Sequence, residues 1–302
     1  MSAVVPPVLP VENSLGRRLG GFVALTKPRI IELLLVTTLP TMIVAARGWP
    51  AVSLIVATLV GGTLAAGGAN AINMFVDRDI DAVMRRTRGR PLVTGVVSPA
   101  GALVFAVALE VVAFVELWAA VNLLSAVLAV SAMLFYVFVY TLWLKRTSRQ
   151  NIVIGGAAGA VPVLVGWAAV RDTVGWAPVV LFALMFVWTP PHFWALAIRY
   201  RDDYRAAHVP MMPVVTTFKR TAAQIFGYSV LVAAVSLVFG WSAGMGPLYW
   251  VSASVLGAVF CGLALQLWRQ PTEARAMRLF HWSITYVTVL FGAMAADQLI
   301  FH

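Results

Sequence analysis

The sequence predicts an all-α integral membrane protein with nine transmembrane helices. The 302 residues are 61% hydrophobic and only 11% charged, with a mean hydropathy of +0.88, whereas a soluble domain has about 25% charged residues. The apolar residues form continuous runs of roughly 20, the length of a helix that spans a bilayer. A membrane β-barrel would show alternating polarity instead, so we expect each segment to satisfy its backbone as a helix.

Nine apolar runs are separated by polar or Pro/Gly-containing breaks. Their approximate centres are Thr37, Leu64, Ala108, Ala132, Val163, Met185, Val230, Gly257 and Val287. Each run is expected to cross the membrane once, which gives the nine predicted spans.

Lysine and arginine are concentrated in alternate connecting segments. Twenty of the 22 lie before the first run or in the segments after the second, fourth, sixth and eighth runs, and only Arg47 and Arg171 lie in the others. The positive-inside rule therefore predicts a multi-pass protein of the cell (inner or plasma) membrane with a cytoplasmic N-terminus and His302 outside. The net charge of +10 then reflects topology and contact with anionic lipid, not nucleic-acid binding.

The chain is expected to form one membrane domain. We predict a cytoplasmic N-terminal segment over residues 1–26 and a single transmembrane domain over residues 27–302. The first 21 residues contain prolines and an acid in place of the apolar core of a cleavable signal, so the first span is expected to direct insertion. Cys261 is the only cysteine, which excludes an intrachain disulfide and a CxxC motif.

The densest charge follows the second run, in NMFVDRDIDAVMRRTRGRP (residues 73–91). If the helix continues into this stretch, Asn73, Asp77 and Asp81 form one row at i, i+4 and i+8, with carboxylates about 6 Å apart along the axis. Asp79 points elsewhere. Carboxylates at that spacing repel each other unless a divalent cation binds them, and hard oxygen ligands that leave room for water and phosphate suit Mg²⁺. The row therefore predicts a magnesium site.

Basic residues accompany this row in three stretches. They are Arg85, Arg86, Arg88 and Arg90 in the same stretch, Lys145 and Arg146 in YTLWLKRTSRQN (140–151), and those of RYRDDYRAAHVPMMP (199–213). The topology puts all three on the cytoplasmic side, where cations can bind the outer oxygens of a phosphate. The arginines alone also fit a solvated loop that obeys the positive-inside rule. Acids and cations above a hydrophobic bundle suit a substrate with a polar head and an apolar tail, such as an isoprenyl diphosphate.

Five stretches carry a resemblance to a known family. They are LTKPRIIELLLVTT (25–38), NMFVDRDIDAVMRRTRGRPL (73–92), YTLWLKRTSRQNIVIGGAAGAVP (140–162), WTPPHFWALAIRYRDDY (188–204) and VPMMPVV (209–215). Together they cover most of the chain and resemble the UbiA-type superfamily of intramembrane prenyltransferases. TPPHFWALA with YRDDY resembles its heme O synthase (protoheme IX farnesyltransferase) members in particular.

The resemblance implies both a fold and a reaction. It implies nine helices around a central cavity, with the active site at the cytoplasmic end and a diphosphate bound through Mg²⁺. It implies transfer of the farnesyl group of farnesyl diphosphate to a vinyl group of heme B with addition of water, giving heme O and diphosphate for cytochrome oxidase. Heme B is then a substrate and not a cofactor, and a downstream heme-modifying membrane enzyme is an expected partner.

The resemblance also implies roles for individual residues. The first metal-binding motif is Asn73, Asp77 and Asp81. The second motif is usually DxxxD, but this chain has Tyr200 and Tyr204 at the acid positions, so Asp202 and Asp203 are its carboxylates, with Asp203 preferred. The implied catalytic residues are Asp77, Asp81, Asp203 and Lys145. The implied diphosphate-binding residues are Asn73, Arg85, Arg86, Arg90, Tyr140, Lys145, Arg146, Tyr200 and Tyr204.

A histidine in the sixth run is a candidate for the acceptor site. His192 follows Pro190 and Pro191, where a helix should kink, and an intramembrane histidine usually faces a cavity. It can ligate heme iron or orient the acceptor, or it can form a hydrogen bond between helices. The aromatic rings of Trp188, Phe193 and Trp194 can shield a farnesyl cation, or they can simply pack. Arg199 and Arg201 are candidates for the heme propionates, which completes a heme-binding set of His192, Trp188, Trp194, Arg199 and Arg201.

Two alternative functions are weighed against this one. Glu110 lies near the middle of the third run, and intramembrane acids are typical of ion-coupled transporters. Such transporters favour paired ionisable groups at the midplane and repeated halves, whereas the acids within these spans are scattered. A polyprenyltransferase that acts on an aromatic quinone precursor predicts a complete second DxxxD motif, which is absent.

Overall fold

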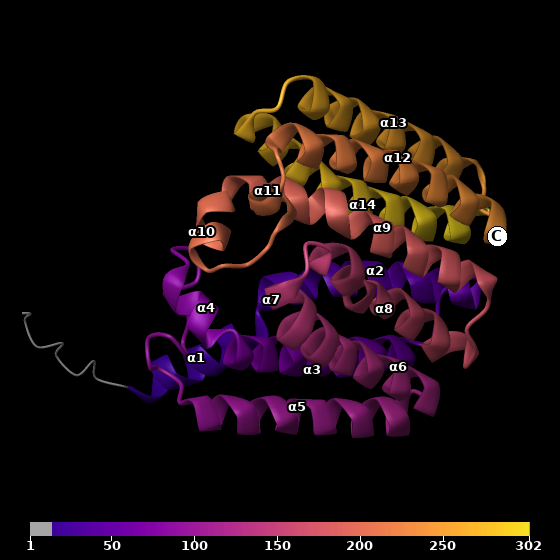
Figure 1. Cartoon of the computed structure of the whole chain (residues 1–302). Helices are drawn as coiled ribbons and strands as arrows, with labels where there is room; N and C mark the ends of the chain where they lie inside the picture. The colour runs from indigo at the N-terminus through magenta and orange to yellow at the C-terminus, as the bar shows by residue number, and fades with distance from the viewer. Residues whose placement is uncertain (1–13, 302) are drawn as a thin grey trace, which may run out of the picture.

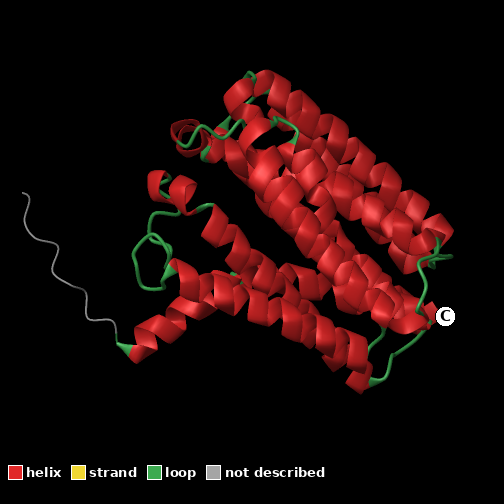
Figure 2. Cartoon of the chain, turned by 60° about the horizontal axis from the view of Figure 1, so that its bottom comes forward, coloured by secondary structure: helices red, strands yellow, loops and turns green. Residues whose placement is uncertain are grey.

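The computed structural model describes residues 14–301, and in that range no residue belongs to a strand (Figure 2). Its elements are α1 (Leu15–Thr26), α2 (Pro28–Ala46), α3 (Val52–Val76), α4 (Arg78–Val83), α5 (Pro99–Ala120), α6 (Leu123–Leu134), η1 (Phe135–Leu144), α7 (Lys145–Thr147), α8 (Asn151–Arg171), α9 (Trp176–Arg199), α10 (Arg201–Ala206), α11 (Met212–Val215), α12 (Phe218–Ser242), α13 (Pro247–Arg269) and α14 (Glu273–Phe301). The element η1 is π-helical. The predicted all-α fold is confirmed.

Each predicted span has a counterpart among these elements. Eight helical units are long and apolar enough to cross a membrane, and α6, η1 and α7 form one of them, Leu123–Thr147. The first apolar run falls in α2, whose apolar part Leu35–Ala46 is shorter. The part of the chain that the structure describes therefore agrees with nine predicted spans and confirms a multi-pass membrane protein.

The nine units form a closed ring. Each of them contacts the next along the chain, and the last unit, α14, also packs against the first, α2. Further contacts between α2 and α8 and between α9 and α14 fill the middle of the bundle. Figure 1 shows α12, α13 and α14 on one side, α3, α5 and α6 on the other, and α2 and α8 between them. The short helices α4, α7, α10 and α11 gather at one end, which we call the charged end and which contains residues 73–92, 145–149 and 199–206.

Helices α3 and α5 pack closely because α3 presents glycines to α5. A Cβ atom on Gly61 would lie 2.1 Å from a carboxylate oxygen of Glu116, and one on Gly68 would lie 2.7 Å from a carboxylate oxygen of Glu110. Small residues of this kind let helix backbones approach each other in a membrane. Glu110, which the transporter alternative singled out, is thus enclosed in the interface between α3 and α5.

The end opposite the charged end is closed by contacts between helices. Asp297 of α14 is fully buried, and its carboxylate accepts the backbone N–H groups of Gly246 (2.5 Å) and Tyr249 (3.1 Å) at the start of α13. An acid at this position satisfies N–H groups that a helix start leaves free and complements the helix dipole. Arg171 of α8 donates to the backbone oxygen of Ala45 at 2.5 Å, so α8 is tied to α2 at the same end.

Candidate active site

The acidic row, Asn73, Asp77 and Asp81, continues from α3 into α4. α3 ends at Val76, but the helical backbone hydrogen bonds continue through the junction. The N–H of Asp77 donates to the backbone oxygen of Asn73 at 2.9 Å, and the N–H of Asp81 donates to the backbone oxygen of Asp77 at 2.8 Å. All three side chains of the row are buried, whereas Asp79 is exposed. The spacing of four residues therefore did predict which polar side chains face inward.

Asp77 is the most enclosed member of the acidic row. One carboxylate oxygen, Oδ2, forms an ion pair with the Lys145 ammonium and accepts a hydrogen bond from the Asn73 amide at 2.7 Å. The other oxygen, Oδ1, is buried and accepts no hydrogen bond from the described residues, with the Arg146 guanidinium 3.6 Å away. A buried carboxylate oxygen with an open coordination position is a typical feature of a cation site.

Asp79 has a role that the sequence did not indicate. Its carboxylate accepts two hydrogen bonds from the Arg146 guanidinium, at 2.7 and 2.8 Å, and Arg146 also donates to the backbone oxygen of Val76 at 3.1 Å. The hydrogen bonds from Arg146 hold the pKa of Asp79 at about 2, below its ordinary value. Asp79 thus orients Arg146 over the end of α3, where the guanidinium lies 3.6 Å from an Asp77 carboxylate oxygen.

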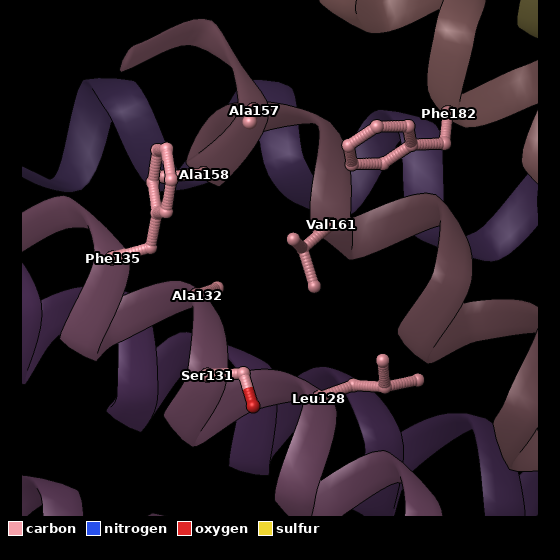
Figure 3. A pocket seen from close by; sticks show the side chains of 8 residues that line it. All are labelled: Leu128, Ser131, Ala132, Phe135, Ala157, Ala158, Val161 and Phe182. Atoms are coloured by element: carbon pink, nitrogen blue, oxygen red, sulfur yellow. The ribbon is translucent and has the colours of Figure 1, made fainter. Parts of the chain in front are cut away.

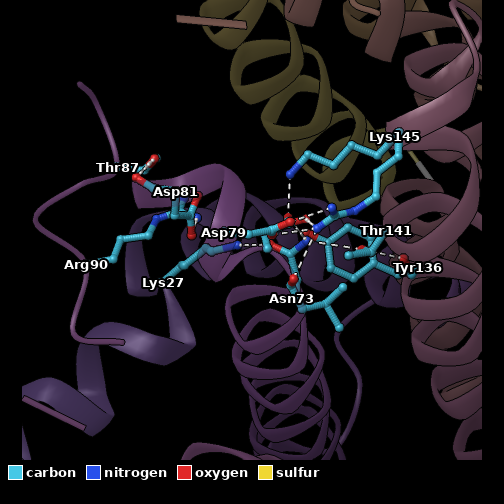
Figure 4. Close-up of polar contacts among 12 residues, drawn as sticks. Lys27, Asn73, Asp79, Asp81, Thr87, Arg90, Tyr136, Thr141 and Lys145 are labelled. Carbon is cyan, nitrogen blue, oxygen red and sulfur yellow. Dashed lines mark hydrogen bonds and ion pairs between the residues drawn. The ribbon is translucent and has the colours of Figure 1, made fainter. Parts of the chain in front are cut away.

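Lys27 is a site residue that was missed. It lies between α1 and α2 in the left-handed backbone conformation (φ = 53°), and its ammonium donates to the Asn73 amide oxygen at 2.8 Å (Figure 4). Burial lowers the pKa of Lys27 to about 7, and the nearby charges of Arg90 and Lys145 act in the same direction. The one available signal was the Lys-Pro pair in LTKPRI, because a proline excludes its predecessor from the helical conformation.

Asp81 is held by the segment that follows α4. Arg90 forms an ion pair with its carboxylate at 2.6 Å, and the Thr87 hydroxyl donates to its backbone oxygen at 3.1 Å. Both contacts bring the segment that follows α4 back to Asp81 (Figure 4). Of the arginines predicted to bind phosphate, Arg90 is therefore the one that pairs with an acid of the first metal-binding motif.

The π-helix η1 carries the other side of the site. In η1 the Thr141 hydroxyl donates to the backbone oxygen of Tyr136, five residues earlier, at 2.8 Å and accepts from the Asn73 amide at 3.1 Å. Tyr136 and Tyr140 stack with ring centroids 5.5 Å apart, and Tyr140 packs on Gly155 of α8. Such π-helical segments are rare and frequent at functional sites. The stacked pair lies in η1, and Lys145, which pairs with Asp77, is the first residue after it.

The second motif is linked to the first through one buried acid. Asp203 of α10 accepts hydrogen bonds from the Arg85 guanidinium and from the backbone N–H of Arg86, both at 3.2 Å. Asp202, in contrast, is exposed and pairs with Arg205 at 3.0 Å. The preference for Asp203 over Asp202 as the acid of the second motif agrees with this difference in burial.

Tyr200, which precedes α10, and Tyr204 of α10 take different positions beside this link. The Arg86 guanidinium lies over the Tyr200 ring, 5.2 Å from its centroid. Tyr204 is buried, and burial raises the pKa of its hydroxyl. Among the described residues no three Asp, Glu, His or Cys side chains come together as a metal-binding group, and each acid of the two motifs forms an ion pair with a cation.

The predicted heme-binding residues of α9 and α10 face different neighbours. The rings of His192 and Trp188 stack on each other; His192 also stacks on Phe280 of α14, and Trp188 donates a hydrogen bond to the backbone of that helix. Trp194 is fully buried against the Tyr228 ring of α12, with centroids 5.5 Å apart, so it packs inside the bundle. Arg199 pairs at 3.9 Å with Glu273, and the buried Nε of Arg201 has no partner among the described residues. The predicted shielding residue Phe193 is 36% exposed.

An apolar pocket of about 200 Å³ lies outside the polar cluster (Figure 3). It is lined by Leu128, Ser131, Ala132, Phe135, Ala157, Ala158, Val161 and Phe182. Its walls come from α6, η1, α8 and α9. Because Ser131 supplies its only side-chain oxygen, this pocket suits an apolar chain and not a diphosphate.

Solved structures share this architecture. The structure of a digeranylgeranylglyceryl phosphate synthase superimposes with a TM-score of 0.77 at 15% identity, covering 93% of this chain and 99% of the other. A UbiA homolog from Archaeoglobus fulgidus bound to GPP and Mg²⁺ gives a TM-score of 0.60 at 14% identity, covering 91% and 99%. The helical ring of this chain therefore has the same fold as these two membrane proteins.

Sequence comparison gives the family. Residues 34–285 match the UbiA prenyltransferase family. The chain belongs to that family. It is 54% identical over 286 residues to the protoheme IX farnesyltransferase of Parafrankia sp. (strain EAN1pec), covering 94% of this chain and 91% of that protein. It is 53% identical over 286 residues to the protoheme IX farnesyltransferase of Frankia alni, covering 94% and 99%. Membership in a prenyltransferase family excludes the transporter alternative.

Proposed function

We propose that the protein transfers the farnesyl group of farnesyl diphosphate to a vinyl group of heme B, with addition of water, to give heme O and diphosphate. The observation that carries the proposal is 54% identity, over 94% of the chain, to a relative named protoheme IX farnesyltransferase. The buried acidic row beside Lys145 and Arg146 supports it, because that cluster combines ligands for a metal with donors for a diphosphate.

Mg²⁺ fits the residues of the acidic row. The supporting observation is the Asp77 Oδ1 atom, a buried oxygen that accepts no hydrogen bond from the described residues. Asn73, Asp77 and Asp81 would hold the ion, with Asp203 as the better placed acid of the second motif because it is buried and Asp202 is not. When bound, the ion neutralises charge on the diphosphate and makes it a better leaving group.

The cations of the site bind and orient the diphosphate. Lys145 and Arg146, with Tyr140, form the proposed clamp, and Arg90 and Lys27 reach the same acidic row from the other side. Each cation pairs with an acid or amide of the site in this structure, so each is already directed at the position where a phosphate oxygen is needed. Arg85, Arg86, Tyr200 and Tyr204 complete the proposed set from the second motif.

The proposed reaction proceeds through an allylic cation. The farnesyl C–O bond breaks and its electrons leave with the diphosphate. The electron pair of a heme vinyl group then forms the new C–C bond. The cation left beside the porphyrin takes up water and loses a proton, which gives the hydroxyethylfarnesyl side chain. The stacked rings of Tyr136 and Tyr140, on the π-helix that leads to Lys145, are better candidates to face the cation than Trp194, which packs against α12.

The proposal includes an orientation and a cellular setting. The charged end faces the cytoplasm in a cell membrane, the C-terminus lies outside, and residues 27–302 act as one transmembrane domain behind the segment 1–26. Support comes from the Lys and Arg distribution and from exposed tryptophans near both ends of the helices, such as Trp176 and Trp241 at one end and Trp143 at the other. A downstream heme-modifying membrane enzyme would accept the hydrophobic product.

Mass spectrometry of hemes tests the proposal. Purified protein is incubated with heme B and farnesyl diphosphate, with and without Mg²⁺, and the hemes are extracted. We expect a species heavier by one farnesyl group and one hydroxyl, only when the metal is present and absent in Asp77→Asn. Unchanged heme from a protein that binds farnesyl diphosphate would reject heme as the acceptor, and prenylation of a phenolic acid in a parallel reaction would favour the quinone-precursor alternative.

A further inference from the structure

His192 is held between two aromatic rings from different helices. Its ring stacks on Trp188 of α9 with centroids 4.3 Å apart and on Phe280 of α14 with centroids 4.7 Å apart. Trp188 in turn donates its indole N–H to the backbone oxygen of Ser283 in α14 at 2.9 Å. The imidazole is only 9% exposed. Its plane is therefore fixed by packing before any ligand binds.

The hydrogen bonds around Ser283 determine which imidazole nitrogen carries the proton. The Nδ1 atom of His192 lies 2.7 Å from the Ser283 hydroxyl oxygen, and that hydroxyl also lies 2.6 Å from the backbone oxygen of Phe280. A carbonyl oxygen can only accept, so the single hydroxyl proton of Ser283 goes to Phe280. The hydroxyl must then accept from Nδ1, which leaves the lone pair of a neutral imidazole on Nε2.

The Nε2 atom is the one unused group of this arrangement. It makes no hydrogen bond with any side chain or backbone group that the structure describes, and it is not among the fully buried polar atoms that lack a partner. The hydrogen bond that joins α9 to α14 uses only Nδ1. An acceptor nitrogen left without a hydrogen-bond donor inside a membrane protein is costly, so Nε2 is expected to have a ligand. Histidines that ligate metals typically donate the other ring N–H to an oxygen acceptor that fixes their orientation, as His192 does.

We infer that Nε2 of His192 binds the iron of the porphyrin acceptor and that Ser283 is the positioning residue that fixes the tautomer. This inference rests on the proposed function and deepens it, since it names the bond that locates the acceptor. The bond from Nε2 would make the porphyrin iron a feature by which the protein recognises its acceptor. Protoporphyrin IX, which has the same vinyl groups but no iron, then lacks the contact that aligns its vinyl group with the farnesyl donor.

Heme titration of the full-length protein in detergent tests the inference directly. We expect wild-type protein to give the absorption and electron paramagnetic resonance signature of histidine-bound ferric heme, His192→Ala to lose it, and Ser283→Ala to weaken heme affinity by about 10- to 100-fold. Ser283→Thr, which retains the hydroxyl, should keep wild-type affinity. Ser229→Ala is the matched control, because Ser229 is also a buried helix serine and donates to a backbone oxygen, that of Ile225 at 2.8 Å.

A second measurement does not depend on any variant. The wild-type kcat/KM for heme B should exceed that for protoporphyrin IX by at least about tenfold, as expected for the loss of a positioning contact. Equal use of both porphyrins, or a heme spectrum unchanged in both His192→Ala and Ser283→Ala, overturns the inference. The two failures are distinguishable. If the wild-type protein shows a histidine-bound heme spectrum that His192→Ala loses, but transfers no farnesyl group to heme, the inference is supported and the proposed function is rejected.

Discussion

The ion pair between Asp77 and Lys145 allows stability and catalysis to be separated. The Asp77 side chain is 0% exposed and that of Lys145 is 13% exposed, so the values for buried pairs apply. Removing one partner of such a pair costs about 3–5 kcal/mol because an unpaired charge stays buried, compared with about 0.2–1 kcal/mol for an exposed pair. We therefore expect Asp77→Asn to lose both activity and several kcal/mol of unfolding free energy.

A double variant separates the two effects. Asp77→Asn combined with Lys145→Met removes both charges, and methionine adapts well to an apolar site, so at least half of the lost stability should return while activity stays absent. The assay is unfolding in mixed detergent micelles followed by tryptophan fluorescence, together with farnesyl transfer at a temperature where all variants are folded. The exposed pair of Asp202 and Arg205 provides the control, with Asp202→Asn expected within about 0.5 kcal/mol of wild type. A double variant as unstable as Asp77→Asn, or an active one, would refute the reasoning.

Three further predictions concern other contacts of the fold. Lys27→Met removes an ammonium that contacts the acidic row. It should raise the KM for farnesyl diphosphate by roughly tenfold or more, since a hydrogen bond to a charged group contributes about 1.5–3 kcal/mol. An unchanged KM would contradict this prediction. Gly155→Ala would put a Cβ atom 2.3 Å from the Tyr140 ring and should lower kcat, whereas Gly159→Ala, with open space around it, should not. Asp297→Ala should lower the free energy of unfolding by about 2–4 kcal/mol, because it leaves the N–H groups of Gly246 and Tyr249 unpaired. Activity measured at low temperature should be retained. A melting curve that does not shift would count against this prediction.

The fold was predictable because its signals are local. A run of about 20 apolar residues predicts a membrane helix without reference to any partner, and all nine runs lie in separate helical units. The burial of Asn73, Asp77 and Asp81 followed from the helical repeat alone. These properties depend on neighbours within one or two helical turns, which the sequence displays directly.

The partners within the site were not predictable because they are distant in sequence. Lys27 and Asn73 are separated by 46 positions, Arg146 and Asp79 by 67, and His192 and Ser283 by 91. Charge patterns identified Lys145 and Arg146 as site cations but gave no means of pairing each with its acid. The π-helix η1 was also missed, since its apolar sequence fits an α-helical span equally well.

The closing contact of the helical ring constrains how the protein is made. About 230 residues separate the end of α2 from the start of α14, and a ribosome that adds about 5–20 residues per second needs roughly 10–50 s to synthesise them. Throughout that interval the face of α2 that will meet α14 can contact only lipid or the insertion machinery. Neighbouring helices can pair as they emerge, but the first and last of them meet only after synthesis of the last span, so the final assembly of the bundle is a post-translational event.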